Sequence, residues 1–216
     1  GLGVVLPPTS CFAMWLGALL FWWKARRQPA PGSREHNIWV EGMEPICAGL
    51  IAGVGNNGIG ISGVCPNCTL RCIRMLADEG QMVQVSVDVD AFRAAFELDV
   101  DVVSNSWGFG QAIPVPAALA LAIGEVATKN RGGRGALVLF AAGNDNRVLV
   151  ASELYSLPEV VTVGAVNAFD ELAPFSNRGP ALDLVAPTGT FTTDLSGAAG
   201  EDPGDYTSLF GGTSAA

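Results

Sequence analysis

Short apolar runs alternate with segments of helical periodicity along most of this chain, and this alternation constrains the fold more than any other feature. Helices are predicted at residues 90–98 and 114–129, the second one opened by a proline, which a helix tolerates in its first turn. Strands are predicted at five apolar runs: residues 69–76, 100–106, 136–141, 160–166 and 182–186. Strands that are apolar on both faces and separated by helices predict an α/β fold, with a mostly parallel sheet and helices on both faces.

The first 45 residues differ in composition from the remainder. Residues 1–40 contain four of the five tryptophans and carry a net charge of +3, whereas the rest of the chain carries −12. We therefore divide the chain into an atypical N-terminal segment, residues 1–45, and an α/β domain, residues 46–216. The overall charge of −9 argues against a nucleic-acid partner, because phosphate binding requires a basic surface.

Residues 11–23 are almost wholly apolar and are followed by Lys24, Arg26 and Arg27. The run is shorter than the roughly 20 residues of a membrane span. Its positive charges come after it, whereas those of a signal peptide come before. Membrane association through this run is therefore disfavoured against the alternative of a non-native sequence, such as one produced by a reading-frame error.

Three of the five cysteines, Cys65, Cys68 and Cys72, lie close together. A zinc site usually requires a second pair of ligands, and no Cys or His follows Cys72 in the sequence. The favoured interpretation is that these are small, buried thiols. A local disulfide between Cys65 and Cys68 is the next alternative.

The run from Gly53 to Gly58 matches the G-x-G-x-x-G pattern of dinucleotide-binding proteins, and Asp78 stands where that pattern expects an acidic residue. The phosphate-binding glycines of that pattern must open a helix. Here they are followed by residues 59–66, which two glycines and a proline interrupt. A dinucleotide-binding α/β domain is therefore only a remote alternative.

Eight motifs in a fixed order resemble those of the subtilisin-like serine peptidases, the subtilases. They span roughly residues 46–216, about four fifths of the chain, and any one of them alone is unspecific. The motifs are Gly49–Gly53, Asn56–Val64, Ser104–Gly108, Ala141–Asn144, Val161–Val166, Phe175–Gly179, Val185–Pro187 and Gly212–Ala215. The resemblance implies the subtilisin-like three-layer α/β fold, truncated here at both ends, and hydrolysis of peptide bonds through a serine acyl-enzyme.

The resemblance also implies roles for individual residues. Ser214 would be the nucleophile, and Asn144 would donate its side-chain amide to the developing oxyanion. Ser106, Trp107 and Gly108 would lie beside the substrate and offer backbone hydrogen bonds to an extended peptide. The alternatives are that Asn144 only stabilises its own turn, and that residues 106–108 are an ordinary strand exit with a tryptophan in the core.

The chain departs from the subtilase pattern at the catalytic base. The family's histidine falls at Met43, and the only histidine, His36, lies outside the motif and is interpreted as a solvated surface residue. The family's aspartate should come earlier still, yet no Asp precedes Asp78. The chain also stops at Ala216, where a helix carrying Ser214 is expected. We therefore expect this polypeptide to be inactive or nearly so, which hydrolysis abolished by Ser214→Ala would contradict.

The alternative function is a pseudopeptidase that binds peptides without turnover. The implied chemistry requires no cofactor, and its partner is a peptide or protein substrate. Residues 55–61 resemble a subtilase calcium loop, in which the Asn57 side chain and backbone carbonyls would bind a structural calcium ion, the alternative being a glycine-rich connector. Metal ligands are otherwise left unassigned. The resemblance implies a secreted protein.

Overall fold

The computed structural model describes residues 51–53, 58, 60–73, 75, 84–189, 191–193, 204–208 and 210–216. The predictions for residues 11–23, for His36, for Met43 and for Asp78 lie outside these residues. The chain divides into two compact units. The first comprises Gly1–Arg74 with Thr192–Thr207, and the second comprises Met75–Phe191 with Ser208–Ala216.

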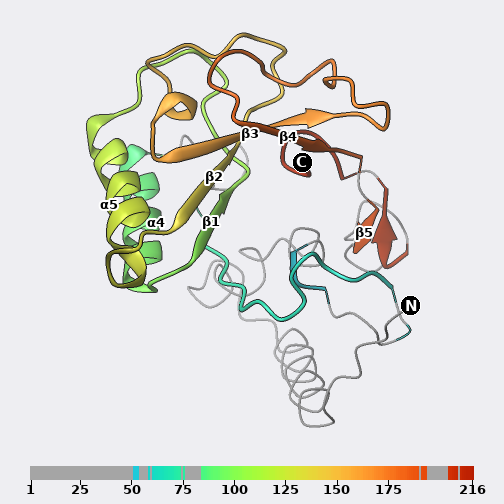
Figure 1. Cartoon of the computed structure of the whole chain (residues 1–216), viewed down its shortest axis with the longest axis horizontal. Coiled ribbons are helices and arrows are strands. Elements are labelled where there is room, and N and C mark those ends of the chain that lie inside the picture. The colour runs from blue at the N-terminus through green and yellow to red at the C-terminus, as the bar shows by residue number, and fades with distance from the viewer. Residues whose placement is uncertain are drawn as a thin grey trace. The chain divides into compact units, whose positions relative to one another are not determined.

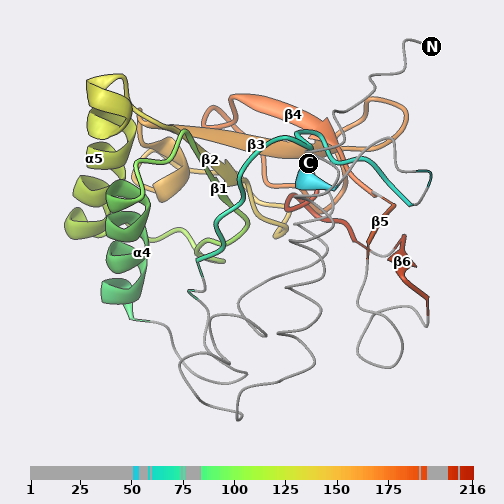
Figure 2. The same ribbon diagram turned by 90° about the horizontal axis from the view of Figure 1, so that it is seen from below.

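The second unit is built on a four-stranded sheet in which every neighbouring pair is parallel. The spatial order of the strands follows their order in the sequence (Figures 1 and 2). The four strands fall within two residues of the predicted limits at either end, and the α/β class and the parallel sheet are confirmed. They are β1 (Val102–Asn105), β2 (Leu137–Ala141), β3 (Val160–Val166) and β4 (Leu184–Pro187).

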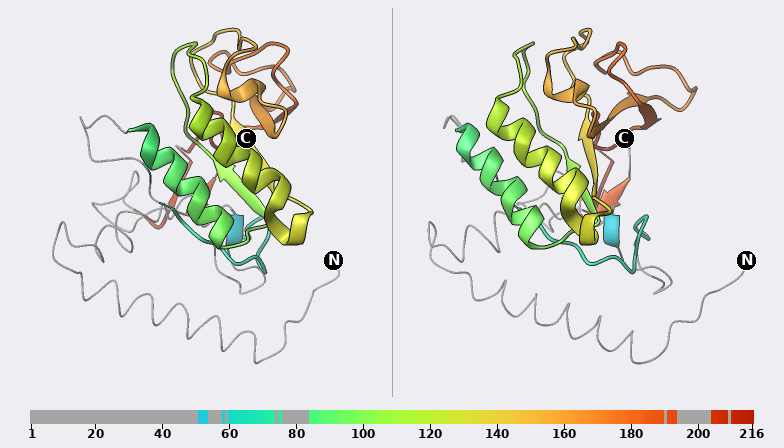
Figure 3. Two further views of the ribbon diagram at one scale, coloured as in Figure 1. Left: turned by 90° about the vertical axis from the view of Figure 1, so that its left-hand side faces the viewer. Right: turned by 60° about the vertical axis from the view of Figure 1, so that its left-hand side comes forward.

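Two helices, α4 (Val85–Glu97) and α5 (Ala117–Gly133), lie side by side on one face of this sheet (Figure 3). Helix α5 forms the crossover between β1 and β2. Its apolar side packs on the sheet, where Ile123 and Phe140 are fully buried, and Phe92 of α4 joins the same core. The core therefore lies between the two helices and the sheet.

Both helix predictions are confirmed in kind but miss the ends. Helix α4 begins five residues before the predicted start, after Gln84, whose side chain makes no capping hydrogen bond. Helix α5 ends irregularly, because Asn130 has an extended ψ of 164° and Arg131 a positive φ of 58°. The buried Asn130 amide donates instead to the carbonyls of Ala95 and Val100, which ties the end of α5 to the end of α4.

Two predictions in the first unit are wrong. Cys65 and Cys68 form a disulfide, so these cysteines are not the small, buried thiols that we favoured. The strand predicted at residues 69–76 is absent from its described part, residues 69–73 and 75. Most of these residues are exposed, and the described ones are not in a strand.

The first unit also contains a short antiparallel pair, β5 (Thr192–Thr193) with β6 (Tyr206–Thr207). Of the chain between the two strands, residues 194–203 lie outside the described residues. Among the helices that the structure describes, none is long and apolar enough to cross a membrane.

Candidate active site

Three segments of the second unit carry the residues expected at the site. Residues 106–110 leave the carboxyl end of β1, and residues 142–147 leave the carboxyl end of β2. Because these strands are parallel neighbours, both segments start from the same edge of the sheet, where open α/β sheets bind ligands. Residues 210–216 form the third segment and contact the second one through hydrogen bonds.

Asn144 is held by Thr213, the residue that precedes Ser214. The Thr213 backbone N–H donates to Asn144 Oδ1 at 2.8 Å, and the Thr213 hydroxyl lies 3.1 Å from the same oxygen. That hydroxyl also accepts a hydrogen bond from the Gly143 N–H at 3.0 Å. An N–H can only donate, so the atom it meets must be the amide oxygen. Among the described residues, no protein acceptor takes a hydrogen bond from Asn144 Nδ2.

Ser214 lies in a tight turn directly after Thr213 and is half-buried. Gly212 has a φ of +74°, and its carbonyl accepts hydrogen bonds from the Thr188 hydroxyl at 2.8 Å and the Ala215 N–H at 3.3 Å. A Cβ added at Gly212 would lie 3.0 Å from Asn144 Nδ2. The structure thus brings the segments of Ser214 and Asn144 together at close range, with a glycine where a side chain would crowd the amide.

Asn177 determines the shape of the turn that presents Asn144. Its side chain is fully buried, and Nδ2 donates to the Ala142 carbonyl at 2.8 Å and to Asp145 Oδ2 at 3.2 Å. Its Oδ1 accepts from the backbone N–H groups of Asp145 and Arg147. Sequence reasoning quoted the Phe175–Gly179 motif but gave Asn177 no role, although a polar residue inside a recurring motif was the available signal.

The side chain of Trp107 belongs to the core. Its indole Nε1 donates to Asn105 Oδ1 at 3.1 Å, and its ring meets the edge of Phe140 with the ring centroids 5.2 Å apart. Ser106 and Gly108 on either side are exposed. The alternative reading of a core tryptophan therefore describes this side chain, while substrate binding by the backbone of residues 106–108 stays a prediction.

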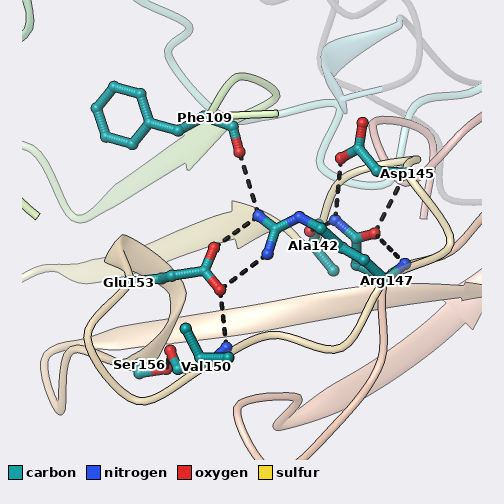
Figure 4. A network of polar contacts seen from close by, with 8 residues as sticks. Phe109, Ala142, Asp145, Arg147, Val150, Glu153 and Ser156 are labelled. Carbon is teal, nitrogen blue, oxygen red and sulfur yellow. Dashed lines mark hydrogen bonds and ion pairs between the residues drawn. The ribbon is translucent and has the colours of Figure 1, made fainter. Parts of the chain in front are cut away.

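A buried ion pair connects two of the three segments (Figure 4). Arg147 Nη1 and Nη2 donate to the two Glu153 carboxylate oxygens at 2.8 and 2.6 Å, and Nη2 also donates to the Phe109 carbonyl at 3.3 Å. The Val150 N–H adds a third bond to the Glu153 carboxylate, whose side chain is only 1% exposed. Sequence reasoning missed this pair because no motif signals it.

The pKa of Glu153 results from two opposing effects. Burial raises this pKa, but the hydrogen bonds from Arg147 and from the Val150 amide outweigh the burial, so the net shift is downward from the ordinary value of 4.5. Burial also raises the pKa of the neighbouring Tyr155 hydroxyl. A Cβ added at Gly108 would lie 2.9 Å from Tyr155 Cζ, so the main chain at Gly108 lies directly against this side chain.

The described residues contain no group of three or more His, Cys, Asp or Glu that could hold a metal ion. Of the loop at residues 55–61, only Gly58, Gly60 and Ile61 are described, and none of them has a side-chain oxygen. Asn57 lies outside the described residues, so the calcium loop stays a prediction. Chemically, the described segments offer a hydroxyl at Ser214 and an amide donor at Asn144.

A family model described as the subtilase family matches residues 45–216. A calcium-dependent protease of Nostoc sp. is 32% identical over 87% of this chain, and the major intracellular serine protease of Bacillus subtilis is 35% identical over 65%. The chain spans 31% and 42% of the length of these two relatives. A solved protease structure from Pseudoalteromonas arctica superimposes with a TM-score of 0.66 at 26% identity, over 79% of this chain and 53% of that one.

Proposed function

The chain belongs to the subtilase family, and from this premise we propose that residues 46–216 are part of the peptidase domain of a serine endopeptidase. In this proposal Ser214 attacks the carbonyl carbon of a peptide bond, and the departing amine leaves an acyl-enzyme that water hydrolyses. The substrate is a peptide or protein that lies extended along residues 106–108. The family match over residues 45–216 also supports our division of the chain near Ile46.

One observation carries the proposal: the pair of contacts from Thr213 to Asn144 Oδ1. They fix the oxygen of the Asn144 amide on the residue that precedes Ser214, and in this proposal Nδ2 donates to the oxygen that gains negative charge in the transition state. A donor of this kind lowers the barrier by about 3–4 kcal/mol in enzymes that use it. A residue that only stabilised its own turn would not need its oxygen bound by the segment of Ser214.

Turnover by this polypeptide would require a proton acceptor for Ser214, and the family's acceptor is missing from its expected position. Met43 stands at the position of the family's histidine, and methionine cannot accept a proton. Triads that lose their base and its orienting partner retain only a small fraction of their activity. This difference favours the second candidate function, a pseudopeptidase that binds peptides at the same site without hydrolysing them.

Two further properties belong to the proposal. The disulfide between Cys65 and Cys68 supports a secreted protein, because disulfides persist in oxidising compartments. One of the relatives is named an intracellular protease, and the name of that relative does not support secretion. The name of the Nostoc relative supports a structural calcium ion. We expect added calcium to raise the melting temperature of this protein, and EDTA to lower it again.

The test of the proposed nucleophile is labelling by a fluorophosphonate, which reacts with activated serines and is more electrophilic than a peptide. We expect slow labelling that maps to Ser214 by mass spectrometry and disappears in Ser214→Ala. Asn144→Ala should slow it by about 100-fold, because the oxyanion donor is lost. Ser152→Ala, an exposed serine outside the three segments, is the matched control. Labelling that survives Ser214→Ala would exclude this nucleophile, and absence of labelling with retained peptide binding would favour the pseudopeptidase.

A further inference from the structure

We propose that Arg147 is a positioning residue that sets the main chain of residues 106–109, the wall expected to bind the substrate, relative to the turn that presents Asn144. This inference rests on the proposed function, because it assigns a role within the same site. Arg147 belongs to none of the motifs that carry the subtilase resemblance, and its role follows from its contacts alone.

The backbone of Arg147 is fixed in the turn of Asn144. Its N–H donates to Asn177 Oδ1 at 3.0 Å, and its carbonyl accepts from the Arg178 N–H at 2.9 Å. The same Asn177 oxygen binds the Asp145 N–H, so one buried side chain holds the turn on either side of Asn146. Movement of Arg147 would therefore move the turn that carries Asn144.

The guanidinium of Arg147 is fixed at the other wall. Nη2 donates to the Phe109 carbonyl at 3.3 Å, directly after Gly108 (Figure 4). The same segment approaches the turn at a second point, since a Cβ added at Gly110 would lie 3.7 Å from Asp145 Oδ1. One side chain thus spans from the turn of Asn144 to the strand exit at Phe109, and its length sets the separation of their main chains.

Glu153 makes this spacer rigid. Its carboxylate accepts both Nη1 and Nη2, a two-point contact that fixes the plane of the guanidinium. The carboxylate is in turn fixed by the Val150 N–H at 2.7 Å and is almost fully buried. A lysine at position 147 keeps the charge but cannot bind both carboxylate oxygens and the Phe109 carbonyl with the geometry of a planar fork.

The experiment compares Arg147→Lys with the wild-type full chain. The ligand is fluorescein-labelled tetra-alanine amide, and its dissociation constant is measured by fluorescence anisotropy under conditions where both proteins are fully folded. We expect the dissociation constant to rise by about 10-fold or more, because misplacement of a positioned backbone weakens every bond it makes. Hydrogen exchange of the amides of residues 106–110 should accelerate in the same variant. Arg93→Lys, which alters an exposed ion pair with Asp90 on α4, should change neither quantity.

The outcomes separate this inference from the proposed function. Unchanged peptide affinity in folded Arg147→Lys, with only a lower melting temperature, overturns the positioning role and leaves the nucleophile untouched. Weakened peptide binding without any fluorophosphonate labelling of the wild type overturns the peptidase proposal but supports the positioning role. A wild type that neither binds the peptide nor reacts overturns both. If Arg147→Lys does not fold, Glu153→Gln gives the same comparison, because the amide keeps the shape but binds the guanidinium less rigidly.

Discussion

At the scale of single residues, Thr213 has the most consequences for the site. Its hydroxyl accepts from the Gly143 N–H and contacts Asn144 Oδ1. Thr213→Val keeps the shape of the side chain but leaves the N–H of the half-buried Gly143 without its acceptor. We expect a loss of about 1–3 kcal/mol in the free energy of unfolding, measured by urea denaturation. Labelling at Ser214 should also slow, because Asn144 loses one of two contacts.

Thr213→Ser is the matched control for this prediction, because it retains the hydroxyl and removes only a methyl group. It should label Ser214 at close to the wild-type rate. If Thr213→Val and Thr213→Ser label equally fast, the hydroxyl does not orient Asn144 and only the backbone contact matters.

The candidates Asn144 and Ser214 come from the subtilase resemblance of the short motifs that contain them, and their roles stay predictions. Sequence reasoning could not reach Arg147 and Glu153. These two side chains pair only because the loop after β2 brings Arg147 next to Glu153, the residue before η1 (Leu154–Ser156), and no periodicity or composition predicts that path. Burial of Glu153 at 2% exposure is likewise a property of tertiary packing, since a glutamate in a loop is ordinarily solvated.

At the scale of elements, helix α5 offers a test of how its length is set. Gly124 lies inside the helix with no atom within 4 Å of an added Cβ, so Gly124→Ala should raise the free energy of unfolding by about 0.5–1 kcal/mol. Gly135 ends the helical segment with a φ of +78°, and an added Cβ would overlap the Ala127 carbonyl. Gly135→Ala should therefore lower the free energy of unfolding by about 2 kcal/mol or more. Both values come from urea denaturation, and equal effects would contradict this account.

The strands of the sheet were predictable because each is a short run of mostly apolar residues. The structure buries the inner strands β2 and β3 more deeply than the outer strands β1 and β4, most of whose residues are exposed or half-buried. The run at residues 69–76 was also predicted as a strand, but its described residues, 69–73 and 75, lie in no described sheet. Apolar content alone therefore does not distinguish a paired strand from a segment beside a disulfide turn. The early start of α4 was missed because apolar content is misleading there as well. Val85 and Val87 are apolar but exposed, so they do not continue the buried face of the helix.

At the scale of the whole molecule, the buried pair links stability to pH. The pKa of Glu153 is lower in the folded chain than its ordinary 4.5, so the folded state binds fewer protons near that pH than the unfolded state. The stability that Glu153 contributes is therefore present above about pH 4.5 and is lost as the pH falls through the lower folded pKa.

Glu153→Gln should destabilise the protein by about 3–5 kcal/mol at neutral pH, since it leaves the Arg147 charge without its partner. The difference from the wild type should narrow as the pH falls below about 4. Urea denaturation at several pH values measures this. Glu125→Gln, which breaks an exposed pair with Lys129, is the control and should show little change. A constant difference at all pH values would mean that the Glu153 carboxylate does not titrate with folding.

The contacts between Thr213 and Asn144 join positions 69 residues apart in the chain. Mutagenesis that aims to alter reactivity therefore has to treat the two segments together. A library that randomises residues 143–145 alone changes the amide while its anchor stays fixed, so most members will present a misaligned donor. A library that varies positions 143–145 and 212–213 together changes the amide donor and its anchor at the same time.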